Sequence, residues 1–249
     1  MIVLTEWRKL VSGAIIVVIA LAGLPLMISA VNAAEDDMDI VSIARGGLLY
    51  DKWYKVIKAP EPQETHAAWP AGNTNKDGAT TWRCKSCHGW DMMGNEGAYS
   101  SGSYLTGIPG VTSMANAPIA DIIAILKDDT HGFEGMMDEG DFYDLANFVS
   151  NGQIDIDALI ERETKSANGD AGQGGAYYGT LCLNCHGVDG DLPKDMGTTL
   201  GTLANSNPWE IIQKILNGQP GEQMPAMRAF DVQVSTDILA YLQTLPLDE

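Results

Sequence analysis

Apolar residues recur three to four positions apart in several segments of this chain, which is typical of amphipathic helices that bury one face. The clearest segment starts at Asn207 and Pro208, a capping residue and a proline suited to the first helical position, and stops at Gly218. The apolar positions of four such segments are Ile122, Ile123, Ile125 and Leu126; Phe142, Leu145, Phe148 and Val149; Ile211, Ile212, Ile215 and Leu216; and Ile238, Leu239, Tyr241, Leu242 and Leu245. No long segment alternates apolar and polar residues as a strand does, so the pattern predicts an all-α fold.

The same order of elements occurs twice along the chain. Residues 46–50 (GGLLY) correspond to residues 174–178 (GGAYY), and the apolar segment at 122–126 corresponds to the one at 211–216. Each half is therefore expected to contain a helix, a cysteine motif, a loop, a helix, a methionine-containing loop and a final helix. The register breaks once, at residues 55–83, where prolines, glycines and asparagines precede the first cysteine motif and predict an inserted loop.

All four cysteines of the chain lie in two copies of the pattern C-x-x-C-H. On a helical turn the two sulfurs lie on one side, where each can form a thioether to a porphyrin vinyl group, and the next residue offers its imidazole to the iron. The candidate cofactor-binding residues are Cys84, Cys87, His88, Cys182, Cys185 and His186. We therefore expect two covalently attached haem c groups.

A structural zinc site and a redox dithiol are the competing interpretations of these cysteines. Zinc sites usually separate their two cysteine pairs by about 15 to 20 residues, whereas Cys87 and Cys182 lie much further apart. A thioredoxin-like dithiol would lie near a strand-helix-strand pattern, and neither motif has one. Haem attachment is the interpretation that accounts for both copies.

With these motifs the chain resembles diheme cytochromes c, in which two class I cytochrome c domains follow one another. The resemblance covers nearly everything after residue 40 and is closest in the second half, through Gly-x-x-Tyr-Tyr, Cys-x-x-Cys-His-Gly, the Pro-Trp helix, Asn-Gly and Met224-Pro225. It implies two tandem haem domains, at residues 34–164 and 165–249. The polar segment 151–170 is the expected junction, with a short helix around residues 158–162.

The resemblance also implies that a methionine in the loop before the last helix is the sixth iron ligand, which is Met224 in the second half. A thioether favours ferrous iron, so a histidine and methionine pair raises the reduction potential. Pro225 keeps Met224 out of helical dihedrals, as a loop that reaches toward the iron requires. Met227 is the alternative ligand, and either methionine could instead fill space in the core.

The sixth ligand of the first haem has three candidates. Met136 is the first choice, and Met137 and His131 remain open alternatives in the same region. His66 lies in the inserted loop and is expected to be an exposed surface residue.

The N-terminal segment predicts export. Residues 10–31 carry no charge and follow Arg8 and Lys9, and residues 31–34 have the small-residue spacing of a signal-peptidase site. The apolar stretch is also long enough to cross a bilayer. We expect residues 1–33 to be a cleaved signal peptide or a retained anchor in the inner membrane, with the remainder in the periplasm in either case.

The charge of the chain restricts its partners. The net charge is −18 and becomes −19 without residues 1–33, which carry Arg8, Lys9 and Glu6. Such an acidic surface argues against nucleic acid and anionic lipid headgroups as partners and favours redox proteins with basic docking surfaces. Acidic residues crowd one region and are candidates for docking, namely Asp128, Asp129, Glu134, Asp138, Glu139, Asp141 and Asp144.

Two function classes fit these observations. The first is a periplasmic electron carrier, or an electron-transfer subunit associated with a membrane complex, that passes single electrons between a respiratory donor and an oxidase or reductase. The second is a diheme redox enzyme similar to peroxidases or thiosulfate dehydrogenases, in which one iron has an open or unusual ligand. Thiosulfate dehydrogenases typically place a cysteine on the catalytic iron, and here no cysteine remains outside the motifs. We therefore expect electron transfer rather than substrate chemistry.

Overall fold

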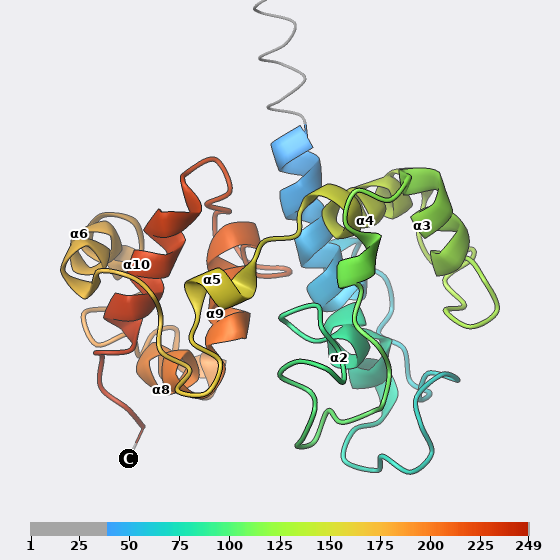
Figure 1. Cartoon of the computed structure of the whole chain (residues 1–249), viewed down its shortest axis with the longest axis horizontal. Helices are drawn as coiled ribbons and strands as arrows, with labels where there is room; N and C mark the ends of the chain where they lie inside the picture. The colour runs from blue at the N-terminus through green and yellow to red at the C-terminus, as the bar shows by residue number, and fades with distance from the viewer. Residues whose placement is uncertain (1–38, 249) are drawn as a thin grey trace, which may run out of the picture. The chain divides into compact units, whose positions relative to one another are not determined.

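The structure is a computed structural model that describes residues 39–248, so the signal or anchor expected at residues 1–33 lies outside the described residues. The segment Ser42–Glu249 forms one compact unit. Figure 1 shows helices joined by long loops. Between residues 39 and 248 the only extended pairings are two isolated bridges, Gly94 with Pro109 and Ile160 with Ala167, so this part of the chain is helical, as the apolar pattern predicted.

The first half contains a long helix and several short ones. Residues 39–56 are helical. The elements that follow are η1 (Gly78–Trp82), α2 (Cys84–His88), η2 (Thr112–Met114), α3 (Ile119–Leu126) and α4 (Glu139–Asn151). Asp138 and Asp141 form a capping box at the start of α4, and Pro118 precedes α3.

The second half repeats this order with shorter loops. Its elements are α5 (Ile156–Leu159), α6 (Ala171–Leu181), α7 (Leu183–His186), η3 (Lys194–Met196), α8 (Leu200–Ser206), α9 (Pro208–Asn217) and α10 (Val232–Leu242). Helix α9 begins with Pro208 at its first residue and ends at Gly218, as the sequence predicted. No helix among residues 39–248 is both long enough and apolar enough to cross a bilayer.

Each half has its own hydrophobic core. The first core is formed by side chains from helical residues 39–56, α3 and α4, among them Leu49, Tyr50, Trp53, Phe142 and Leu145. The second core is formed mainly by α6, α8, α9 and α10, and it also includes Trp90 and Tyr99 from the loop after α2. The loop after α2, which belongs to the first half, thus contributes side chains to the second core.

A glycine permits the same close helix crossing in both halves. A Cβ atom on Gly46 would lie 2.0 Å from the carbonyl oxygen of Asp144 in α4, and one on Gly174 would lie 1.9 Å from the carbonyl oxygen of Asp237 in α10. No side chain fits in so small a gap. Gly46 and Gly174 thus make matching helix contacts in the two halves.

Two segments differ from the sequence interpretation. The helix expected around residues 158–162 lies at Ile156–Leu159, and Ile156, Leu159 and Ile160 are buried in the second core. The junction therefore packs as part of the fold. The inserted loop, expected at residues 55–83, begins after a helix that extends to residue 56, and its last residues form η1.

Polar contacts join the two cores. Asp51 pairs with Arg83 of its own half and with Lys214 of α9. The guanidinium of Arg162 donates to Asp91 at 2.7 Å, and the amide of Gln213 donates to the carbonyl of Trp90 at 3.2 Å. These contacts link the two cores.

Candidate cofactor sites

The first cysteine motif occupies a single short helix. Cys84, Cys87 and His88 all lie in α2, which Gly89 ends with a φ of 84°. The Nδ1–H of His88 donates to the carbonyl of Pro109 at 2.8 Å, and Tyr50 donates its hydroxyl to the carbonyl of Gly89 at 2.8 Å. Because Nδ1 is occupied, Nε2 is the nitrogen that His88 has left for a metal.

The second motif is built in the same way. Cys182 caps α7, which contains Cys185 and His186 and ends at Gly187 with a φ of 74°. The Nδ1–H of His186 donates to the carbonyl of Leu192 at 2.9 Å, and Tyr178 donates to the carbonyl of Gly187 at 2.6 Å. The six residues predicted from the sequence thus form two helical turns with matching supports.

The chemistry of the cysteines fits covalent attachment. All four are free thiols, so neither motif contains a disulfide. Burial raises the pKa of Cys84 to about 12, and it raises the pKa of Cys87 and of Cys182 to about 11. Reduced thiols are the form from which thioether bonds to porphyrin vinyl groups are made. Within residues 39–248 no group of three or more metal-binding side chains is present that could hold a metal ion.

The surroundings of the second motif fit a flat apolar ring. Three large apolar side chains near this motif in the sequence are exposed: Leu181 at 39%, Val188 at 69% and Leu192 at 38%. A porphyrin bound through Cys182 and Cys185 would give apolar side chains of this kind a surface to pack against.

The two methionines considered for the second iron both lie in the loop after α9, and they differ in their packing. A Cβ atom on Gly218 would lie 2.5 Å from the carbonyl oxygen of Met224, so the backbone folds back closely over that glycine. Met227 donates its backbone N–H to Ile215 at 3.0 Å and packs against the second core. Met224 is half-buried and does not pack in that core. The two methionines thus differ in their packing, and Met224 stays the predicted ligand of the second iron.

In the first half the three candidate ligands differ in their surroundings. Met136 is 37% exposed, and Met137 is buried in the first core. The ring of His131 lies beside the ring of His88, with ring centres 6.3 Å apart.

His66 is buried, so the prediction of an exposed surface residue is wrong. Its Nε2 bonds the carbonyl of His131 at 2.9 Å, its Nδ1 accepts from the N–H of Ala68 at 3.1 Å, and its ring lies 4.3 Å from that of Trp82. The inserted loop folds over the first core and brings His66 to His131, two residues far apart in the sequence. No local sequence pattern could reveal this contact.

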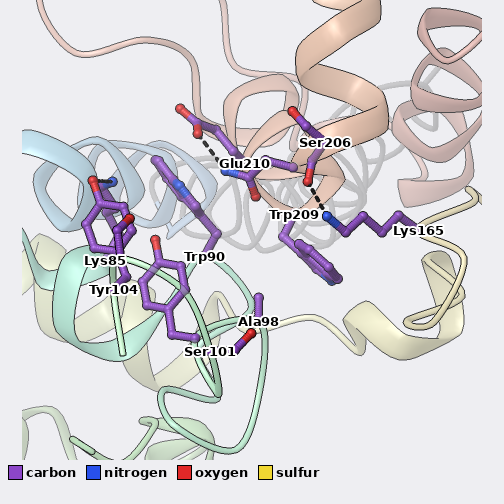
Figure 2. A pocket seen from close by; sticks show the side chains of 12 residues that line it. Lys85, Trp90, Ala98, Ser101, Tyr104, Lys165, Ser206, Trp209 and Glu210 are labelled. Carbon is purple, nitrogen blue, oxygen red and sulfur yellow. Dashed lines mark hydrogen bonds between the residues drawn. The ribbon is translucent and has the colours of Figure 1, made fainter. Parts of the chain in front are cut away.

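A pocket of about 230 Å³ lies between α2, the loop at residues 98–104, and helices α8 and α9. Figure 2 shows Lys85 and Tyr104 at the left of it, Trp90 and Glu210 in the centre, and Trp209 and Lys165 to the right. Burial lowers the pKa of Lys85 to about 7. The side chains that line the pocket include Lys85 but no cysteine or histidine of either motif, so the pocket belongs to the contact between the two cores.

Comparison with known proteins bears on the second half of the chain. The family model of cytochrome c oxidase, cbb3-type, subunit III matches residues 169–242. This range contains α6 to α10 and the second cysteine motif, and it ends before the last residues of the chain. None of the curated proteins matches this chain. The match indicates a cytochrome c domain with covalently bound haem c, and hence a haem-based electron-transfer protein.

Proposed function

We propose that this protein is a periplasmic diheme c-type cytochrome that passes single electrons between a respiratory donor and an oxidase or reductase. The observation that carries the proposal is the repeated support of the two motifs. In each half a tyrosine bonds the glycine after the motif and a backbone carbonyl holds Nδ1 of the histidine. Since the family match includes one of these motifs, the other is proposed to bind haem as well.

The two motifs and the resemblance to diheme cytochromes c support the following ligands. Cys84 and Cys87 would hold the first haem by thioethers, with His88 on its iron, and Cys182 and Cys185 would hold the second, with His186 and Met224 on its iron. Bound haem stores and releases one electron at a time. The carbonyls of Pro109 and Leu192 orient the two histidine rings, which fixes the nitrogen that faces the metal.

The matched family suggests the kind of partner. Its description names a subunit of a cbb3-type oxidase, so we infer that this chain works in or beside a membrane-bound respiratory complex. The signal or anchor expected at residues 1–33 supports this location, and the net charge of −18 favours partners with basic surfaces.

Counting the haems tests the proposal. The full chain would be produced with a cytochrome c maturation system, and intact mass and haem absorbance would be measured for the wild type and two variants. We expect two haems in the wild type and one in each double variant, Cys84→Ala with Cys87→Ala and Cys182→Ala with Cys185→Ala. One haem in the wild type would overturn the diheme proposal. Tight binding of carbon monoxide by the untreated protein would instead favour a redox enzyme with an open iron.

A further inference from the structure

We propose that His131 is the second axial ligand of the first haem, so that this haem has two histidine ligands and the second haem has a histidine and a methionine. This inference rests on the proposed function, in which the motif in α2 carries a haem. It assigns a role to a histidine outside both motifs and makes the two haems chemically different.

The distance between the two rings is the first observation. The ring centres of His88 and His131 are 6.3 Å apart, and the ring planes differ by 22°. A metal–imidazole bond is about 2 Å long and the nitrogen lies about 1 Å from its ring centre, so two imidazoles on one metal ion have ring centres about 6 Å apart. The observed separation matches that of two imidazoles that bind one metal ion.

The hydrogen bonds of His131 leave the correct nitrogen for a ligand. Its Nδ1–H donates to the carboxylate of Asp128 at 3.1 Å, and the same carboxylate accepts from the backbone N–H groups of Thr130 at 2.9 Å and His131 at 2.8 Å. Histidine ligands almost always donate their other ring N–H to a carboxylate or carbonyl. His88 and His186 use a carbonyl for this purpose, and His131 uses Asp128. The Nε2 atoms of His88, His131 and His186 have no hydrogen-bond partner among residues 39–248.

The inserted loop holds the His131 turn in place. Since Nδ1 of His66 accepts from Ala68, neutral His66 carries its proton on Nε2 and donates it to the carbonyl of His131 at 2.9 Å. Phe133, two residues after His131, is buried and lies 5.7 Å from Trp82 and 5.9 Å from Trp53 between ring centres. A long surface insertion is uncommon in a compact fold without a function. Here the inserted loop holds the turn of His131, and the described part of the second half has no such turn.

Neither methionine of this loop has comparable support. Met136 is 37% exposed, and Met137 is 8% exposed and packs within the first core. A buried methionine is usually a packing residue. The sequence alone favoured Met136, whereas the position of the His131 ring beside that of His88 favours the histidine.

Unequal ligands predict unequal reduction potentials. Methionine raises the potential of a haem relative to a second histidine. The first haem would thus be the lower-potential centre, and an electron on it would move to the second haem. Electrons would therefore pass from the first haem to the second within one molecule.

Spectroscopy of the wild type tests the inference without any substitution. Ferric haem with a methionine ligand has a charge-transfer band that bis-histidine haem lacks. Once the haem count is two, we expect this band at the intensity of one haem per molecule, and a redox titration with two separate steps. A band at the intensity of two haems would overturn the inference and leave the diheme proposal intact. A count of one haem would overturn the diheme proposal instead.

Two variants then identify the residue. His131→Ala should leave the first ferric haem high-spin, and added imidazole should restore a low-spin spectrum with one charge-transfer band per molecule. Met136→Leu is the matched control in the same turn and should change neither spectrum nor potential. Intact mass would verify that both variants still carry two haems. A low-spin first haem in His131→Ala without imidazole, or loss of its ligand in Met136→Leu, would overturn the assignment.

Discussion

Tyr50 and Tyr178 make the same contact in the two halves, because each donates its hydroxyl to the carbonyl of the glycine that ends a motif helix. Both tyrosine side chains are almost completely buried. Removing the hydroxyl would leave a carbonyl without this donor, at a cost of about 1 to 3 kcal/mol. We predict that Tyr50→Phe and Tyr178→Phe each lower the free energy of unfolding by about that amount in denaturant titrations. Tyr143→Phe, at a tyrosine that is 45% exposed, is the control and should change little. Equal stability of all three variants would contradict this role.

The two methionines of the loop after α9 should respond differently to substitution. Met224→Leu would remove the thioether while conserving volume, so it should abolish the charge-transfer band of the second haem and lower its reduction potential. Met227→Leu should keep both, because Met227 packs against the second core, and should cost less than about 1.5 kcal/mol of stability. Absorbance of the ferric protein and a redox titration would distinguish the two. A band lost in Met227→Leu and kept in Met224→Leu would show that the assignment is reversed.

At the residue scale, sequence reasoning is strongest where chemistry requires a fixed spacing. The six motif residues were predicted because thioether attachment needs two cysteines three apart and an adjacent histidine. The burial of His66 was not predictable, because it depends on where the inserted loop folds. Asp128 was interpreted as one member of an acidic region, whereas its carboxylate bonds the turn of His131.

At the scale of elements, one glycine permits each of two helix crossings, that of residues 39–56 with α4 and that of α6 with α10. Gly174→Ala would place a Cβ atom 1.9 Å from the carbonyl oxygen of Asp237, and Gly46→Ala would place one 2.0 Å from that of Asp144. Each change should lower the free energy of unfolding by about 1 to 3 kcal/mol, because backbone atoms must move apart. The measurement is denaturant unfolding followed by far-UV circular dichroism.

The control for this prediction lies in the same helix. Gly179 is also in α6, and a Cβ atom there would meet no atom within 4 Å. Gly179→Ala should therefore stabilise the helix by up to about 1 kcal/mol, since alanine is the better helix former. If Gly174→Ala proved as stable as Gly179→Ala, the close crossing would be wrong.

The helices themselves were largely predictable, because each has an apolar stripe and a recognisable start or stop. Helix α9 shows this best, with Pro208 at its start and Gly218 after its end. The short α5 begins two residues before the expected helix, because its position is set by Ile156 and Leu159 packing in the second core. Tertiary packing decides such short helices more than their own residues do.

At the scale of the whole molecule, Asp51 connects the two halves. Its side chain is 4% exposed and pairs with Arg83 and Lys214, which belong to different halves. Removing one partner of a buried ion pair costs about 3 to 5 kcal/mol. Asp51→Asn should therefore lower the free energy of unfolding by about this amount at neutral pH, whereas Asp129→Asn, at an exposed carboxylate, should not.

The pH dependence of this effect follows from the pKa of Asp51. Burial raises this pKa, but the charges of Lys214 and Arg83 lower it more, so it lies below its ordinary value of 3.8. Above that value the carboxylate is ionised in the folded and the unfolded chain, and its contribution is fully present. As the pH falls from 3.8 through the lower folded pKa, the unfolded chain binds the proton first and the contribution is lost. The stability difference between wild type and Asp51→Asn should thus be constant near neutral pH and shrink below about pH 4. A difference that grew on acidification would contradict the ion pair.

The acidic region of the first half offers fewer free charges than its sequence suggests. Asp141 and Asp144 pair with Arg45, and Asp138 caps α4. The side chains of Glu134 and Glu139 are 70% and 80% exposed and lie near Lys127, which compensates only one of them. Of this region, these glutamates are the clearest candidates to attract a basic redox partner.

If they guide docking, the rate of electron exchange with a basic partner should fall as salt rises, because the Debye length shortens to about 3 Å at 1 M. Glu134→Gln combined with Glu139→Gln should reduce that salt dependence by lowering the rate at low ionic strength and leaving it unchanged at high ionic strength. The pair Glu61→Gln and Glu64→Gln is the matched control, because it removes the same charge from exposed positions in the inserted loop. Stopped-flow mixing with a small basic cytochrome over a range of salt concentrations would measure the rates. Equal effects of the two double variants would mean that only the net charge of the molecule matters, and a local docking site on the first half would then be ruled out.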